Sequence, residues 1–415
     1  MIRRLGVVII VLLVAGVSLA FAGGQNEPAK EKAVLDFWSL ADPEKLEDLV
    51  AEFNSKYPNV QIKLTTYGDP AITEALNAAA ASGTGPDLFR NWGGELQYAL
   101  VRAGFVADIS NSRQKYKWAD RVIPSALGLS TYNGKLYGVP FSYNCMTAFY
   151  RKDIFDRFAL KPPKTYNELL EINKKLKAGG VTPFATAGKF GWHPAIFMDA
   201  LFEKYAGAQL HDKLNRMEVS WNSKAIIDSY AEVKRWVDNG WFNENFISLS
   251  PDEVFMPVFK GDVAMIYQGV WIEPAIVQAG LDLNLFDTFA FPFETGRLDC
   301  WIDQYAVGAK SKHPDQALQF IDYVLNLDIA SRYYTGVSSS LQGFKKDPAK
   351  EPLAARSREI LNKAKGSFLP SDTVLPFDVV HTIFEVQDQV FAGAMTAQQA
   401  AARIQQAVEE AKSKR

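Results

Sequence analysis

Val34-Leu-Asp-Phe-Trp38 and Val60-Gln-Ile-Lys-Leu64 are two short apolar runs that decide the fold class. The first has the length and composition of a short strand, and the second alternates as a strand does. Apolar residues at helical spacing lie between the two runs, at Leu46, Leu49, Val50 and Phe53. An alanine-rich helix follows the second run and is expected to stop at Ser82-Gly83. Strand, helix, strand and helix with short links predict a parallel α/β sheet.

Both helices are expected to begin at an Asp-Pro pair, Asp42-Pro43 and Asp69-Pro70. Aspartate favours the N-cap because its carboxylate accepts backbone N–H groups, and proline favours the first turn. The pattern therefore predicts that Asp69 is an N-cap, which competes with a role in contacting a ligand.

The first twenty-two residues have the pattern of a signal peptide, so 1–22 are excluded from the fold. Arg3 and Arg4 precede an apolar stretch that is too short to span a bilayer, and Ala20-Phe21-Ala22 fits a cleavage site. Residues 23–32 are expected to form a polar, flexible leader. No cysteine follows Ala22, so we expect an exported, periplasmic protein without a membrane anchor.

The size and charge of the remaining chain narrow its class. A chain of roughly 390 residues exceeds what one core supports, so two lobes are expected. Without Arg3 and Arg4 the chain has no basic excess, which argues against a nucleic-acid partner. Aromatic residues make up 13% and include nine tryptophans, which suits carbohydrate recognition as well as core packing. Cys145 and Cys300 are far apart in sequence, so both a disulfide and two free thiols stay open, with free thiols slightly favoured.

The segment from Phe259 to Trp271 contains the clearest site pattern. It is interpreted as a polar turn, a short strand over 263–267, a glycine at Gly269 and an exposed aromatic at Trp271. Ligands of α/β sheets bind in the crevice beyond the strand ends. Trp271 is therefore predicted to offer a flat apolar face to a ligand, although core packing would also explain it.

Eight segments in one order resemble the sugar-binding branch of the extracellular solute-binding proteins that feed ABC importers, the group that includes maltose-binding protein. They are Phe37-Trp38, Ala81-Ser-Gly-Thr-Gly-Pro-Asp-Leu88, Ala103-Gly-Phe-Val-Ala-Asp-Ile109, Asn133-Gly-Lys-Leu-Tyr-Gly-Val-Pro140, Tyr150-Arg-Lys-Asp-Ile-Phe155, Pro163-Lys-Thr-Tyr166, Lys260-Gly-Asp-Val-Ala-Met265 with Gly269-Val-Trp271, and Thr335-Gly336.

The resemblance implies a type II-like periplasmic-binding-protein fold, in which two lobes, each a sheet flanked by helices, close on a ligand. Carried over by segment, lobe one is expected at 33–141 plus 302–342 and lobe two at 146–287 plus 346–415. The hinge crossovers are then expected near 142–145, 288–301 and 343–345. The implied partners are a carbohydrate ligand and a membrane permease of an ABC transporter, with the receptor itself a monomer.

The resemblance also nominates ligand-binding residues, each with a structural alternative. Asn91 could instead cap a helix, Glu95 could be salt-bridged, Asn144 could form a turn and Asp303 could only fix the hinge. His193, before Pro194, is expected at a helix start rather than at the ligand. The nominated set is Trp38, Ser39, Arg90, Asn91, Trp92, Glu95, Asn144, Trp192, Trp271, Trp301, Asp303 and Gln304.

No catalytic, metal-binding or cofactor-binding motif is recognised in the sequence. The sequence thus favours a non-enzymatic receptor that captures a mono- or oligosaccharide for an ABC transporter. A hydrolase or lyase acting in the same aromatic cleft is an alternative, although no pair of carboxylates is nominated for it. A sensor subunit for a receptor kinase and a receptor for a non-sugar solute such as a polyamine are the others.

Overall fold

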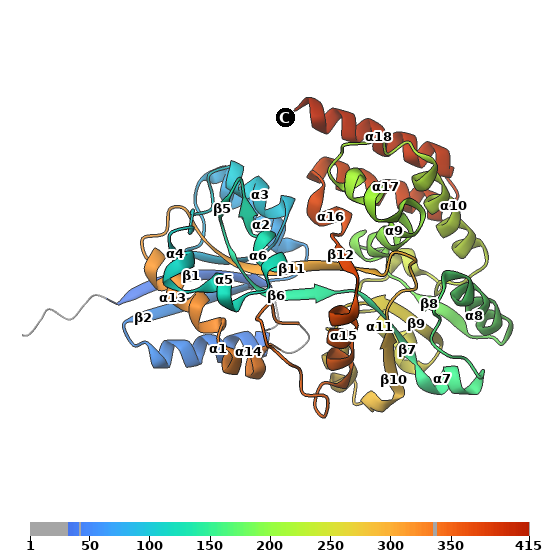
Figure 1. Cartoon of the computed structure of the whole chain (residues 1–415), viewed down its shortest axis with the longest axis horizontal. Helices are drawn as coiled ribbons and strands as arrows, with labels where there is room; N and C mark the ends of the chain where they lie inside the picture. Colours follow the sequence, from blue (N-terminus) through green and yellow to red (C-terminus); the bar gives the residue numbers. More distant parts are fainter. Residues whose placement is uncertain (1–31, 41–42, 335–337, 415) are drawn as a thin grey trace, which may run out of the picture.

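The computed structural model describes residues 32–40, 43–334 and 338–414. The predicted signal peptide, all of the leader but Lys32, and Asp42 therefore lie outside the described residues, as does the Thr335-Gly336 segment. Figure 1 shows two lobes side by side, joined by long strands that run from one lobe to the other.

The sheet of lobe one begins with the strands expected from the sequence. Strand β1 (Ala33–Leu40) pairs in parallel with β2 (Val60–Tyr67) and with β3 (Leu88–Trp92), so the predicted parallel α/β start is confirmed. Among the described residues the sheet has six strands in the order β12-β11-β3-β1-β2, with β6 also paired to β11. The other three strands are β6 (Val139–Cys145), β11 (Arg297–Val307) and β12 (Gly366–Phe368).

Lobe two has its own sheet in the order β10-β7-β9-β8. Its strands are β7 (Thr147–Arg151), β8 (Thr182–Ala185), β9 (Val263–Gln268) and β10 (Phe286–Phe289). A separate hairpin of β4 (Thr131–Tyr132) and β5 (Lys135–Leu136) encloses Asn133 and Gly134.

Helices cover the sheet of lobe one because their apolar faces pack on it. Phe53 of the first helix and Phe320 lie edge to face, with ring centroids 5.1 Å apart, in the same buried cluster as Leu35 and Phe37. These helices are α1 (Pro43–Lys56), α2 (Ala71–Ser82), α3 (Glu95–Arg102), α4 (Ser112–Lys115), α5 (Trp118–Arg121), α6 (Pro124–Gly128), α13 (Pro314–Val324) and α14 (Leu327–Tyr333).

Lobe two contains the longer helices. Thr165 caps α8, since its side chain accepts the Glu168 backbone N–H. Helix α9 is interrupted at Gly207, whose backbone is not helical. The helices are α7 (Lys152–Arg157), α8 (Tyr166–Ala178), α9 (Trp192–Asn215), α10 (Lys224–Asp238), α11 (Phe255–Lys260), α12 (Ile272–Gln278), α17 (Phe377–Phe391) and α18 (Ala397–Ser413), with 3-10 turns at Phe246–Ser248 and Leu283–Leu285.

Two further helices, α15 (Pro352–Lys363) and α16 (Ser371–Val374), lie where the lobes meet. The backbone N–H groups of Leu353 and Ala354 donate to the Glu273 carboxylate of lobe two, at 3.0 and 2.9 Å. Farther along the same helix, Ile360 and Leu361 pack against the core cluster of lobe one. Helix α15 thus contacts both lobes.

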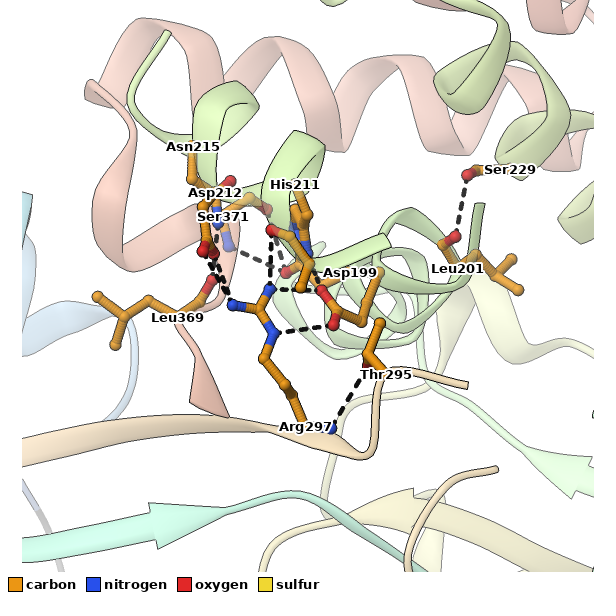
Figure 2. Close-up of polar contacts among 12 residues, drawn as sticks. Asp199, Leu201, His211, Asp212, Asn215, Ser229, Thr295, Arg297, Leu369 and Ser371 are labelled. Carbon is orange, nitrogen blue, oxygen red and sulfur yellow. Dashed lines mark hydrogen bonds and ion pairs between the residues drawn. The ribbon is translucent and has the colours of Figure 1, made fainter. Parts of the chain in front are cut away.

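Strand β11 is anchored in lobe two at its first residue. The Arg297 guanidinium donates to Glu203 at 2.9 and 2.7 Å and to Asp212 at 2.8 and 3.0 Å, both on α9; Figure 2 shows Arg297 with Asp212 and His211. Burial would raise the pKa of Glu203, but hydrogen bonds from His211 and Arg297 outweigh it and hold that pKa at about 2. The carboxylate therefore stays charged, and the ion pairs fix the start of β11 to α9.

None of the helices within the described residues is long and apolar enough to cross a bilayer.

Candidate ligand site at the lobe junction

Three of the nominated tryptophans lie together in the structure although 109 residue numbers separate the first from the last. Trp192 opens α9, Trp271 directly precedes α12, and Trp301 lies within β11. The Trp271 ring is 5.7 Å from that of Trp301 and 6.5 Å from that of Trp192, both nearly edge to face. Trp301 is buried, whereas Trp192 and Trp271 are partly exposed. We call Trp192, Trp271 and Trp301 the tryptophan wall.

His193 packs against Trp192 of this wall, with ring centroids 5.3 Å apart. Its Nδ1 lies 3.2 Å from the Thr186 hydroxyl and its Nε2 lies 3.1 Å from the Gln268 amide nitrogen at the end of β9. Complete burial lowers the pKa of His193 to about 3, so the ring is neutral. The expected position of His193 at a helix start is confirmed, since it is the second residue of α9.

Arg90 and Asp303 form an ion pair in the sheet of lobe one. Arg90 Nη2 donates to Asp303 Oδ1 at 2.7 Å. Burial alone would lower the pKa of Arg90, but the neighbouring Asp303 carboxylate raises it, so the guanidinium is charged. Arg90 Nε is buried and has no hydrogen-bond partner. The Nε–H group of Arg90 is therefore a hydrogen-bond donor without a partner.

Asn144 and Ser142 donate further hydrogen bonds to the Asp303 carboxylate. Asp303 Oδ2 accepts the Ser142 hydroxyl and, at 2.9 Å, the Asn144 amide. Asn144 Oδ1 in turn accepts the backbone N–H of Ser338 at 2.8 Å. Asn144 and Asp303 are 2% and 1% exposed, so both join the crossover strands to each other. These contacts join β6 to β11 around the Asp303 carboxylate, whose oxygens are engaged within the protein.

Asn91, Gln304 and Glu95 are also engaged inside lobe one. The Asn91 amide donates to Gln97 at 2.9 Å, and the Gln304 amide donates to the Trp92 carbonyl at 3.1 Å. Glu95 is ion-paired with Arg102 on its own helix, with Arg102 Nη1 3.2 Å from Oε2. The salt-bridge interpretation of Glu95 is confirmed.

Trp38, Ser39 and Trp92 lie at the ends of the two central strands of lobe one. Trp38 packs against Tyr67, with centroids 5.3 Å apart, and remains partly exposed. Ser39 is 1% exposed and its hydroxyl has no hydrogen-bond partner. Trp92 packs against the core clusters of both lobes, so it lies where they meet.

Three carboxyl groups near this junction were not nominated from the sequence: Asp69, Asp252 and Asp372. Burial raises the pKa of Asp69 to about 6, Arg90 opposes the shift and Asp252 of lobe two adds to it. Burial raises the pKa of Asp372 in α16 to about 7, and Asp69 adds to that shift. The pKa of Asp69 thus responds to charged groups of both lobes.

The predicted N-cap role of Asp69 is wrong. Helix α2 starts at Ala71, its N-cap is Pro70, and no side chain caps it. Proline fills the capping position, so the Asp69 carboxylate does not cap the helix. Asp252 follows Pro251 in a turn and Asp372 lies in the short helix α16, and no pattern in the sequence marks either residue.

Helix α16 brings Asp372 against lobe one. A Cβ on Gly94 would lie 2.4 Å from the Thr373 carbonyl oxygen, so the backbones of the two lobes are in direct contact there. Asp372 Oδ1 is buried without a partner, as is Nε1 of Trp192. The junction therefore combines aromatic faces with unsatisfied polar atoms from both lobes.

A pocket of about 780 Å³ lies elsewhere, on the outer face of lobe one. Its charged side chains already pair with one another, as Arg332 does with Glu52 and Arg121 with Asp322. No tryptophan lines it. We therefore place the candidate site at the lobe junction. Within the described residues, no group of three or more His, Cys, Asp or Glu side chains is arranged to hold a metal ion.

The structure has two sheets in separate lobes, which shared strands link. Aromatic and polar groups lie between the lobes, as in a two-lobed ligand receptor. The comparison with known families agrees. The model of the bacterial extracellular solute-binding proteins matches residues 38–328, and the chain belongs to this family.

Individual relatives extend the similarity over most of the chain. An uncharacterised ABC transporter extracellular-binding protein of Pyrococcus horikoshii is 23% identical over 87% of this chain and 85% of its own. A multiple sugar-binding protein of Streptococcus mutans is 23% identical over 73% of each chain. A solved structure from work on xylan utilization by Caldanaerobius polysaccharolyticus has a TM-score of 0.84 and 26% identity, covering 90% of this chain and 99% of that one.

Proposed function

We propose that this protein is a non-enzymatic, exported receptor that binds a mono- or oligosaccharide between its lobes and delivers it to the membrane permease of an ABC transporter. The tryptophan wall is the observation on which the proposal rests. A sugar ring has two apolar faces and a rim of hydroxyls, so a receptor needs aromatic faces with donors and acceptors around them. The sugar-binding relative from Streptococcus mutans supports this reading.

The polar groups proposed to meet the sugar hydroxyls are those left without partners at the junction. They include donors and acceptors: Trp192 Nε1, Arg90 Nε, the Ser39 hydroxyl and Asp372 Oδ1. An unsatisfied buried polar group costs roughly 1–3 kcal/mol, so hydroxyls that pair with these atoms bind favourably and an analogue lacking them does not. Trp271, Trp192 and Trp38 are the proposed stacking residues, with Trp92 at the base of the site.

Asn91, Asn144, Asp303, Gln304 and Glu95 are proposed to shape the site rather than touch the ligand, since their hydrogen bonds and ion pairs lie within the protein. The same contacts argue against the hydrolase alternative. Asp303 accepts three side-chain groups and Glu95 is ion-paired, so neither is positioned as a free acid or base.

A cationic solute is the second candidate ligand because three carboxyl groups gather near the junction. The raised pKa values of Asp69 and Asp372 make these groups partly neutral near pH 7, which weakens their attraction for a cation. A half-protonated carboxyl both donates and accepts hydrogen bonds, which suits hydroxyls. The observations thus favour the sugar.

The lobe ranges, the hinge crossovers near 142–145, 288–301 and 343–345, and closure on the ligand are part of the proposal. So are the cleaved signal peptide, the periplasmic location, the lack of a membrane anchor and the monomeric state. Small-angle scattering of the mature chain should show a smaller radius of gyration with saturating ligand than without. Superimposable profiles would contradict hinge closure.

A thermal-shift screen of the mature protein tests the function. The protein is first unfolded and refolded to remove any co-purified ligand. Mono-, di- and oligosaccharides are compared with a polyamine at millimolar concentration. A ligand at a thousand times its Kd stabilises by about 4 kcal/mol, which raises Tm by several degrees. We expect one sugar class to give this shift. A shift with the polyamine and with no sugar would contradict the proposal.

A further inference from the structure

Cys145 and Cys300 lie directly opposite each other in the antiparallel pair of β6 and β11. Cys145 is the last residue of β6, and Figure 1 shows both strands crossing between the lobes. In the sequence these cysteines are remote, so their pairing was left open there. The strand register places the two cysteines opposite each other at the end of β6, where the chain leaves lobe one.

The backbone hydrogen bonds show which kind of antiparallel pair this is. The Met146 N–H donates to the Asp299 carbonyl at 2.9 Å, so the neighbouring pair is hydrogen-bonded. The Tyr143 N–H points the other way, to the Ser338 carbonyl at 2.7 Å. Because the two kinds of pair alternate along the ladder, Cys145 and Cys300 form a non-hydrogen-bonded pair.

Such a pair has the spacing that a disulfide needs. Opposite residues in a non-hydrogen-bonded pair have Cα atoms roughly 4.5 Å apart and side chains on one face, and disulfides span Cα separations of about 4.4–6.8 Å. Both residues have free thiols in this structure. Cys145 is 4% and Cys300 0% exposed, so no other thiol competes for them in the folded chain.

We propose that Cys145 and Cys300 form an intramolecular disulfide in the exported protein, which joins the two crossover strands at the hinge. The bond would close residues 146–299 into a loop at the base of lobe two. The loop ends stay fixed to each other while the lobes move. The inference depends on export and not on the identity of the ligand.

The reaction is a thiol–disulfide exchange with a disulfide oxidant, either a small molecule or a protein, of the kind present outside the cytoplasm. The thiolate of one cysteine attacks the oxidant and forms a mixed disulfide; the thiolate of the other then displaces the second thiol. Two protons and two electrons leave the cysteine pair, and the oxidant disulfide becomes two thiols. Burial, followed by contact with Cys145, raises the pKa of Cys300 in the folded chain, so exchange proceeds before the strands are fully packed.

Alkylation of the cysteines tests the bond. The full chain is first exported into a bacterial periplasm by its own signal segment. The protein is denatured in iodoacetamide without and with prior reduction, and its intact mass is measured. We expect no adduct without reduction and two adducts after it, with one peptide pair containing Cys145 and Cys300 in the non-reduced digest. Two adducts without reduction, or disulfide-linked dimers, would overturn the proposal.

Thermal unfolding with and without dithiothreitol gives an independent readout. Because the disulfide closes a long loop, reduction should lower Tm of the wild type by several degrees. The double variant Cys145→Ser, Cys300→Ser should unfold at one temperature in both buffers. An equal effect of dithiothreitol on both proteins would also overturn the proposal.

Discussion

The Trp271 indole packs directly on the backbone of Gly269. A Cβ built on Gly269 would lie 1.9 Å from Cζ3 of that ring, a separation that no packing tolerates. The absence of a side chain at the end of β9 therefore decides where the tryptophan lies. This contact links the local sequence Gly-Val-Trp to the orientation of the tryptophan wall.

Gly269→Ala should displace Trp271 and weaken ligand binding at least tenfold, because the ring can no longer lie over the strand end. Isothermal titration with the sugar found in the thermal-shift screen measures the effect. Gly128→Ala is the matched control, since a Cβ there meets nothing within 4 Å. Equal affinities of the two variants would show that the position of Trp271 does not matter to the ligand.

Asp303→Asn should lower the free energy of unfolding by about 2–3 kcal/mol, because Arg90 then keeps a largely buried charge without its counterion. Urea unfolding followed by circular dichroism measures the loss. Asp228→Asn removes the partly exposed partner of the exposed Lys224 and should cost less than about 0.5 kcal/mol. A similar loss in both variants would mean that the Arg90–Asp303 pair does not hold the crossover strands.

Asp372 should make the protein less stable as pH rises. Burial raises the pKa of Asp372 in the folded chain to about 7, above its ordinary value of 3.8, so the native state binds its proton more tightly than the unfolded chain does. The stabilisation of the folded state by the proton on Asp372 is present in full below about pH 4. It is lost as the pH approaches and passes 7. Asp372→Asn should thus exceed the wild type in stability by about 1–3 kcal/mol at pH 8 and match it at pH 4.

Chemical unfolding of both proteins across this pH range checks the sign. Asp315→Asn is the control, because Asp315 is 82% exposed and its substitution should leave the pH profile unchanged. A difference between wild type and Asp372→Asn that does not grow from pH 4 to pH 8 would contradict the assignment.

Local periodicity was sufficient to predict the strand–helix alternation at the start of the chain. Val34 and Val60 open the two runs that form the parallel pair β1–β2, in which Leu35 and Ile62 are buried whereas Val34 is exposed. The Asn133-Gly134 turn was predictable because its residues adopt a positive φ. Asp69 was misassigned since Asp-Pro fits a helix start, and the sequence does not show that Pro70 takes the capping position.

The site was only partly predictable. Trp192, Trp271 and Trp301 were nominated one at a time, and only the crossing of β11 into the neighbourhood of β9 and α9 brings them together. The contacts of Asn144 and Asp303 depend on strand register, which a sequence does not give. The pairing of Cys145 with Cys300 depends on the same register.

Binding by Trp271→Ala is the measurement that tests the central claim most directly. Truncation removes the middle ring of the tryptophan wall, whose side chain is partly exposed, so the fold should survive. Isothermal titration of wild type and variant with the identified sugar should show affinity reduced more than tenfold, at an unchanged circular dichroism spectrum. An unchanged Kd in the folded variant would contradict a sugar site at the tryptophan wall.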